Sequence, residues 1–86
     1  MAKVVMYCTT VCPYCTAAER LLKSRGVTEI EKIRIDLDPA KQAEMIARSG
    51  GARSVPQVFI NDTHIGGFDD TSALAAAGKL VPRLAA

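Results

Sequence analysis

Two cysteines three positions apart, Cys12 and Cys15, are the side chains of this sequence best suited to chemistry. They lie between an apolar segment, 4–8, and a segment with a helical pattern, 16–25. At the start of a helix, cysteines at this spacing lie on one face, one turn apart. Unpaired N–H groups and the helix dipole there favour a thiolate, which is the nucleophilic form of cysteine. Cys15 is then close enough to attack a mixed disulfide on Cys12, so the motif predicts dithiol–disulfide exchange.

The first half of the chain has the pattern of a strand–helix–strand unit around this motif. Residues 3–8 are mostly apolar, which is typical of a central strand buried on both faces. Gly26 follows the helical segment and is expected to end it. Apolar and charged residues alternate over 33–37, which predicts a half-buried strand near a sheet edge. Such a unit is expected to be parallel and right-handed.

A second helix is predicted after this unit. Asp38 is suited to the N-cap and Pro39 to the first helical position. Three apolar residues recur at helical spacing, Ala43, Ile46 and Ala47, and we expect them to form the buried stripe of this helix.

The rest of the chain predicts a hairpin followed by a helix. Residues 57–66 have a hairpin pattern with its turn at 61–62. Asp69 or Asp70 is expected to cap a third helix over 71–77. The order βαβ then ββα predicts an α/β fold, with a mixed four-stranded sheet covered by helices on both faces.

Length and composition predict a single domain, 1–86, with one modest core. Lys and Arg are scattered among acidic residues, and the net charge is +2, so we expect no nucleic-acid partner. No segment approaches the ~18 apolar residues needed to cross a bilayer, so we expect no membrane association. Three cysteines do not make a secreted disulfide framework, and the chain opens without a signal-peptide pattern. We therefore expect a cytoplasmic protein, and a monomer.

Three separated motifs resemble those of the glutaredoxins, a family with the thioredoxin-like fold. The first is Cys-Pro-Tyr-Cys at 12–15, directly after a strand. The second is Ser-Val-Pro at 54–56, similar to the Thr-Val-Pro that precedes the third strand in the family. The third is Gly-Gly-Phe-Asp-Asp at 66–70, similar to the family's Gly-Gly-x-Asp-Asp turn. Together they extend over nearly the whole chain, in length and spacing most similar to the bacterial glutaredoxin 3 type.

This resemblance implies an enzyme, a glutathione-dependent thiol–disulfide oxidoreductase. Its substrates would be protein disulfides and protein–glutathione mixed disulfides, with Cys12 as the nucleophile and Cys15 as the resolving cysteine. Glutathione would be the reductant and co-substrate, and no metal is expected. The implied partners are glutathione and disulfide-containing or glutathionylated proteins.

The resemblance also implies where glutathione binds. The family's proline corresponding to Pro56 is cis, which would set the Val55 backbone beside Cys12 to pair, strand-like, with the cysteinyl backbone of glutathione. Gly67 would let the backbone approach the ligand closely. The helix start at 69–70 would suit the carboxylate and ammonium of the γ-glutamyl end. The full set of implied binding residues is Tyr14, Gln42, Ser54, Val55, Pro56, Gly67, Phe68, Asp69 and Asp70.

Some positions differ from the family pattern. Thr9 stands where many relatives carry a lysine or arginine, so the helix N-terminus must supply most of the thiolate stabilisation, with Arg53 as a candidate helper. Gln42 falls where the family often carries a basic or amide residue for the glycine carboxylate. Ser54 replaces threonine and keeps the hydroxyl. Phe68 stands where some relatives have cysteine or a small polar residue, and it adds an apolar wall.

Three alternatives involve other chemistry. Cys8, Cys12, Cys15 and His64 have the donor types of a Cys₃His zinc site, although Cys8 lies in a strand, where burial as a small hydrophobe explains it. An iron–sulfur carrier is a second alternative, against which Pro13 and the second motif cysteine argue. A third is a thioredoxin-like reductant driven by a flavoprotein reductase, but thioredoxins usually carry Cys-Gly-Pro-Cys and lack the Gly-Gly-x-Asp-Asp turn.

Overall fold

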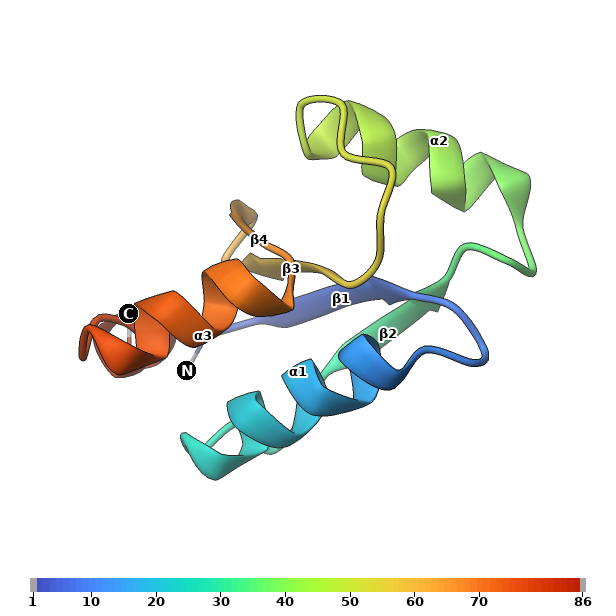
Figure 1. The fold of residues 1–86 in the computed structure, drawn as a ribbon. Helices are drawn as coiled ribbons and strands as arrows, with labels where there is room; N and C mark the ends of the chain where they lie inside the picture. Colours follow the sequence, from blue (N-terminus) through green and yellow to red (C-terminus); the bar gives the residue numbers. More distant parts are fainter. Residues whose placement is uncertain (1, 86) are drawn as a thin grey trace.

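A computed structural model describes residues 2–85, which form a four-stranded mixed sheet with helices on both faces (Figure 1). The strand order is β2-β1-β3-β4; β1 is parallel to β2, and β3 is antiparallel to both β1 and β4. This architecture confirms the predicted α/β fold. In chain order the elements are β1 (Val4–Cys8), α1 (Pro13–Ser24), β2 (Glu31–Arg34), α2 (Pro39–Arg48), β3 (Gln57–Ile60), β4 (Thr63–Gly66), α3 (Phe68–Ala76) and α4 (Leu80–Ala85).

The central strand β1 divides the core into two halves. Its five residues are all buried, as predicted for a central strand, and its side chains alternate between the two faces of the sheet. Met6 packs with Leu22 of α1 on one face, and Tyr7 packs with Met45 of α2 on the other. Helix α2 therefore covers one face alone, while α1 and α3 cover the opposite face (Figure 1).

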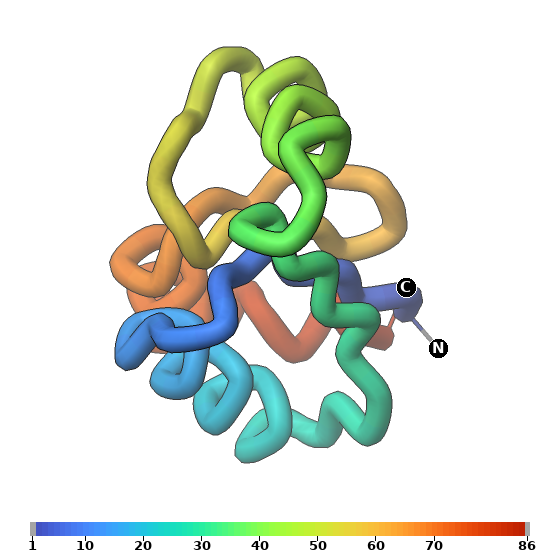
Figure 2. The backbone as a smooth tube through the Cα atoms, turned by 90° about the vertical axis from the view of Figure 1, so that its right-hand side faces the viewer, coloured from blue at the N-terminus to red at the C-terminus, as the bar shows by residue number. Residues whose placement is uncertain are grey.

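The two ends of the described chain lie close together, at the right of the view in Figure 2. The backbone N–H of Ala2 donates to the carbonyl of Leu84 at 3.2 Å, and Leu84 packs against the core half that holds α1. Within residues 2–85, no helix combines the length and apolar character needed to span a membrane.

Helix α1 begins at the cysteine motif, as predicted, just before the segment 16–25 that carries the helical pattern. Cys12 is its N-cap, with extended φ −153° and ψ 99°, and Pro13 occupies the opening turn. A proline fits there because it has no N–H to leave unpaired and its φ is already helical. Gly26 adopts φ +101° just beyond Ser24, so the predicted stop is confirmed.

Helix α2 starts as predicted but buries a different face. The Asp38 side chain accepts a hydrogen bond from the Ala40 N–H at 3.0 Å, which makes Asp38 the N-cap. The predicted stripe is wrong at Ala43 and Ala47, which are both exposed, whereas Met45 is fully buried and Ile46 partly buried.

Two polar residues of α2 explain this rotation. The Tyr7 hydroxyl donates to the Glu44 carboxylate, and the Arg48 guanidinium donates to the same hydroxyl at 2.7 Å. These bonds turn the face that carries Met45 toward the sheet, where the long, flexible methionine side chain reaches the core and a methyl group would not.

Strand β2 lies at the sheet edge as predicted, but it is shorter than the alternating pattern. The strand ends at Arg34; Ile35 is still buried, whereas Leu37 is 70% exposed. The chain turns away from the sheet over 35–37, so the last apolar position of the pattern faces solvent.

The hairpin and the helix after it largely follow the prediction. Asn61 and Asp62 adopt φ +50° and +66°, and both residue types tolerate this conformation in tight turns. The predicted cap of the third helix is wrong, because α3 begins at Phe68 with Gly67 as its N-cap. The Asp70 carboxylate instead reaches back from the third helical position and accepts from the Gly67 N–H at 3.2 Å.

Candidate active site

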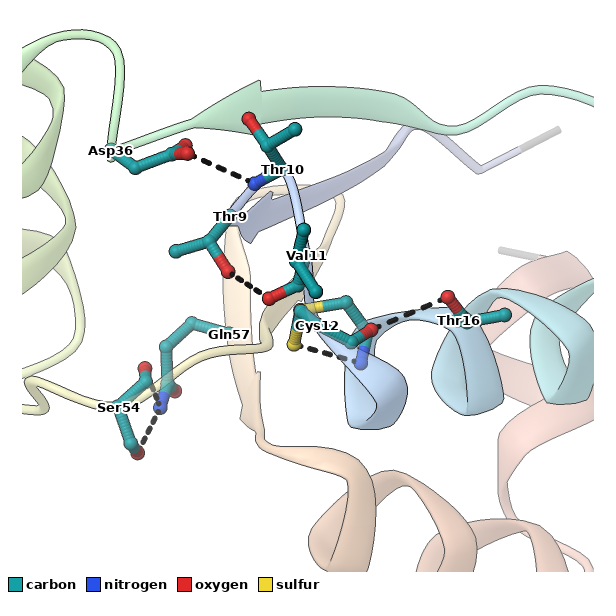
Figure 3. The surroundings of a disulfide bond; sticks show 9 residues. Thr9, Thr10, Val11, Cys12, Thr16, Asp36, Ser54 and Gln57 are labelled. Atoms are coloured by element: carbon teal, nitrogen blue, oxygen red, sulfur yellow. Dashed lines mark hydrogen bonds between the residues drawn. A yellow bond between two sulfur atoms is a disulfide. The ribbon is translucent and has the colours of Figure 1, made fainter.

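Cys12 and Cys15 are joined in a disulfide at the start of α1 (Figure 3). Their Cα atoms are 5.2 Å apart, a separation that helix geometry supplies at this spacing. The Cys15 N–H donates to the Cys12 sulfur at 3.1 Å. In the reduced protein this N–H and the helix dipole would favour a thiolate on Cys12.

The two sulfurs differ in their access to solvent. Cys12 is half-buried, whereas Cys15 is 4% exposed and belongs to the core between the sheet and α1. Only Cys12 is therefore placed to meet a disulfide in another molecule, and Cys15 is placed to attack a bond that Cys12 has formed. These positions fit the roles predicted for the two cysteines.

The loop 9–11 that delivers Cys12 is held to the end of β2 (Figure 3). The Thr10 N–H donates to the Asp36 carboxylate at 3.1 Å, and the Thr9 hydroxyl donates to the Val11 carbonyl at 3.1 Å. Hydrogen bonding by Thr10 lowers the pKa of Asp36, so this carboxylate stays ionised as an anchor of the loop. Val11 is 86% exposed and presents an apolar surface next to Cys12.

The loop 54–57 passes beside Cys12 from the other side (Figure 3). The peptide bond between Val55 and Pro56 is cis, as the resemblance implied. Pro56 is buried, and Val55 packs against both halves of the core. The loop is thus fixed between the redox pair and the start of α3.

A groove of about 280 Å³ lies between this loop and the start of α3. Its lining contains every residue of the predicted glutathione set except Gln42, which is exposed on α2. Gln57 lines it as well, although the sequence analysis did not select it. The lining residues are Tyr14, Ser54, Val55, Pro56, Gln57, Gly67, Phe68, Asp69 and Asp70.

The groove lining contains two aromatic and two acidic side chains. The rings of Tyr14 and Phe68 lie 6.2 Å apart between centroids, and Tyr14 is 65% exposed. Asp69 and Asp70 lie in the first turn of α3, where acidic side chains complement the helix dipole. The groove therefore offers an apolar surface, carboxylates and helix N–H groups side by side.

Glycine occupies positions 66 and 67, next to the groove, for two different physical reasons. Gly66 adopts φ +121°, and a Cβ there would lie 2.8 Å from the Asp70 Cγ, so no larger residue fits beside the capping carboxylate. A Cβ on Gly67 would lie 3.4 Å from the Pro56 carbonyl, which is ordinary contact. The capping of α3 thus requires Gly66, whereas Gly67 leaves the groove open next to Pro56.

Gln57 is the polar residue that the sequence analysis missed. It is 4% exposed, and its amide nitrogen donates to the Ser54 carbonyl at 3.0 Å and to the Ser54 hydroxyl at 3.3 Å (Figure 3). Its amide oxygen lies 2.6 Å from His64 Nε2. The Ser54 carbonyl can only accept, so the orientation of the amide is settled and His64 must donate. A glutamine opening an otherwise apolar strand was the available signal.

The residues considered for a zinc site have other contacts in the structure. His64 Nε2 is engaged with Gln57, and the imidazole packs on Phe59, with ring centroids 5.0 Å apart. Cys8 is buried, and burial raises the pKa of its thiol. Within residues 2–85, no three Cys, His, Asp or Glu side chains gather into a set that could hold a metal.

A mixed sheet of this order with a Cys-x-x-Cys pair opening α1 defines a thiol–disulfide oxidoreductase of the thioredoxin-like fold. Residues 4–65 match the Glutaredoxin family model. The chain is 51% identical over 80 residues to a glutaredoxin of Neisseria meningitidis, covering 93% of each sequence. It is 50% identical over 84 residues to glutaredoxin 3 of Escherichia coli, covering 98% of this chain and 99% of the relative. The chain belongs to the glutaredoxin family.

Solved structures agree with this assignment. The chain resembles the crystal structure of a buckwheat glutaredoxin–glutathione complex with a TM-score of 0.86 and 34% sequence identity. The match covers 98% of this chain and 77% of the buckwheat chain.

Proposed function

We propose that this protein uses glutathione to reduce protein disulfides and protein–glutathione mixed disulfides. The observation that carries this proposal is the groove, which is lined by Tyr14 of the redox motif and combines the cis-proline loop with the acidic start of α3. The buckwheat relative, solved with glutathione, supports it.

Glutathione would lie in the groove with its sulfur at Cys12. The backbone of Val55 would pair with the cysteinyl residue of glutathione, as one strand pairs with another. The α-carboxylate of the γ-glutamyl end would meet the N–H groups of α3, and its ammonium would meet Asp69 or Asp70. Tyr14 and Phe68 would cover the apolar side of the ligand. Gln42 is exposed on α2 outside the groove lining, so it would contact the glycine carboxylate only where glutathione extends beyond the groove.

With a glutathionylated protein, Cys12 alone does the chemistry. Its thiolate attacks the glutathionyl sulfur, the S–S bond to the protein breaks, and its electron pair leaves with the protein thiolate, which takes up a proton. A second glutathione thiolate then attacks the glutathionyl sulfur on Cys12 and leaves as glutathione disulfide. Cys12 returns as a thiolate, stabilised by the Cys15 N–H.

With a protein disulfide, both cysteines take part. The Cys12 thiolate attacks one substrate sulfur and displaces the other as a thiolate. Cys15 passes its proton to that departing thiolate and attacks the Cys12 sulfur, which releases the reduced substrate and leaves the intramolecular disulfide. Two glutathione molecules then restore the dithiol. The disulfide between Cys12 and Cys15 in the structure corresponds to the oxidised end of this cycle.

The experiment is reduction of the mixed disulfide of glutathione and 2-mercaptoethanol, coupled to glutathione reductase and NADPH. We expect turnover by the wild type and by Cys15→Ser, and none by Cys12→Ser. With a protein disulfide as substrate, Cys15→Ser should also lose activity, because the mixed disulfide on Cys12 is no longer resolved. An inactive wild type would refute the glutathione proposal, and an active Cys12→Ser would refute the assigned roles.

We also propose a cytoplasmic monomer whose partners are glutathione and disulfide-containing or glutathionylated proteins. A reducing compartment suits this chemistry, because glutathione must be available to restore the dithiol after each cycle. Size-exclusion chromatography of the reduced protein tests the oligomeric state.

A further inference from the structure

We propose that a cationic cavity beside the redox pair is a subsite for an acidic side chain next to the reactive cysteine of a protein substrate. This inference rests on the proposed function and adds a substrate preference to it. The cavity has a volume of about 150 Å³ and shares no lining residue with the glutathione groove. Its lining includes Cys12 and Cys15, two cations of β2, Lys32 and Arg34, and one carboxylate, Glu19.

The sheet register directs both cations toward the redox pair. Lys32 pairs with Met6 and Arg34 with Cys8 across β1 and β2. Paired residues of neighbouring strands project from the same face, and Met6 and Cys8 belong to the core half that also contains Cys15. Lys32 and Arg34 therefore project from the α1 face of the sheet, the face on which the disulfide lies.

The positive charge in this cavity is incompletely neutralised. Glu19 of α1 pairs with Lys32 and with Lys23, each at 3.3 Å, so one carboxylate serves two ammonium groups. The Arg34 guanidinium makes no hydrogen bond or ion pair with a side chain among residues 2–85, and its charge acts at longer range on Asp36, whose pKa it lowers. The nearby Asp36 is engaged with the Thr10 N–H. An arginine with free donors can hold a carboxylate through two parallel hydrogen bonds.

The position of glutathione determines which part of a substrate meets this cavity. In a glutathionylated protein, the glutathionyl part would fill the groove between Tyr14 and the start of α3. The polypeptide must then leave Cys12 in another direction, and the cavity opens at the same cysteine. One residue along an extended chain spans ~3.3 Å, so a side chain adjacent to the target cysteine reaches the cavity. Asp69 and Asp70 make the groove side acidic, whereas Lys32 and Arg34 make this side basic, which favours an acidic side chain here.

The test uses glutathionylated peptides that are identical except for Glu, Gln or Lys beside the cysteine. At low salt, kcat/KM of the wild type should be about fivefold higher for the Glu peptide than for the Lys peptide, the upper range for an exposed ion pair. The preference should shrink at high salt because exposed charges are screened. Arg34→Gln should bring the three peptides close to equality, and Arg34→Lys should restore part of the preference. Arg20→Gln is the matched control, since it removes an exposed charge of α1 outside the cavity lining.

A wild type without charge preference, or an unchanged preference in Arg34→Gln, would overturn the subsite. The subsite would also be overturned if Arg34→Gln lost activity equally toward all three peptides and its Cys12 were alkylated more slowly by uncharged iodoacetamide. Arg34 would then act on the Cys12 thiolate and not on the substrate. The mixed disulfide of glutathione and 2-mercaptoethanol separates the two proposals. If the wild type fails to reduce it, the proposed function fails; if it is reduced without any peptide preference, only the subsite fails.

Discussion

Replacing Gln57 by leucine should weaken both the fold and glutathione binding, because Gln57 ties the groove loop to the sheet. The change keeps the side-chain volume but removes the hydrogen bonds to Ser54 and His64. His64 and Ser54 are both exposed, so their freed groups can turn to water, and the loss is that of the hydrogen bonds themselves. One net hydrogen bond contributes about 1 kcal/mol, and the change removes the bonds to both Ser54 and His64, so the free energy of unfolding should fall by about 1–2 kcal/mol.

The same loss should appear in the KM for glutathione. The Val55 backbone, which would pair with glutathione, follows Ser54 directly, so a looser Ser54 costs binding energy. A loss of about 1 kcal/mol corresponds to a roughly fivefold higher KM. The kcat at saturating glutathione and the rate of Cys12 alkylation should change little, since the cysteines and their N–H donor are untouched.

Urea unfolding measures the stability term, and glutathione titration in the coupled assay measures KM. His64→Ala is the matched control: it removes the donor to the amide oxygen but leaves both Gln57 bonds to Ser54, so its KM should rise less. Gln57→Glu keeps an acceptor for His64 but faces the Ser54 carbonyl with an oxygen, so its KM should rise at least as much as that of Gln57→Leu. A Gln57→Leu protein with reduced stability and an unchanged KM would refute the reasoning about the loop.

Three further predictions concern other parts of the fold. The Tyr7 hydroxyl donates to Glu44 and lowers the pKa of this carboxyl, which stabilises the fold while Glu44 is ionised and is lost as pH falls through the folded-state pKa. Tyr7→Phe should therefore reduce the pH dependence of the unfolding free energy below pH 4.5, measured in urea. The buried Cys8, its pKa raised by desolvation, should resist iodoacetamide in the native reduced protein while Cys12 reacts, as mass spectrometry would show. Gly66→Ala should lower the unfolding free energy by more than ~1 kcal/mol, because φ +121° and the Asp70 side chain both exclude a methyl group.

Each of these has a clear contrary result. If the unfolding free energy of Tyr7→Phe depended on pH as in the wild type, the hydrogen bond from Tyr7 would not be what lowers the pKa of Glu44. Alkylation of Cys8 at the rate of Cys12 would mean that its strand opens readily. A Gly66→Ala protein as stable as the wild type would mean that α3 can begin without its present cap.

Local chemistry made most of the fold and the redox centre predictable from the sequence. The backbone preferences of Pro13, Asp38 and Gly26 act within a few residues, so the helix starts and stops could be inferred without a structure. The redox pair also depends only on helix spacing, which brings Cys12 and Cys15 within bonding distance in any tertiary setting. The groove residues were predictable through the family resemblance, since three motifs in one order imply one arrangement.

Tertiary structure alone decided the features that depend on distant segments meeting. The buried face of α2 follows Glu44 and Arg48, which bond a hydroxyl on β1, and no local pattern encodes that rotation. The Gln57 link to His64 requires the pairing of β3 with β4. The cationic cavity likewise requires the register of β2 on β1, because charges on an edge strand meet the redox cysteines only when the sheet is assembled. Hydrogen bonds and charge interactions depend on distance in space and not on separation along the chain, so they form only once the tertiary structure brings the residues together.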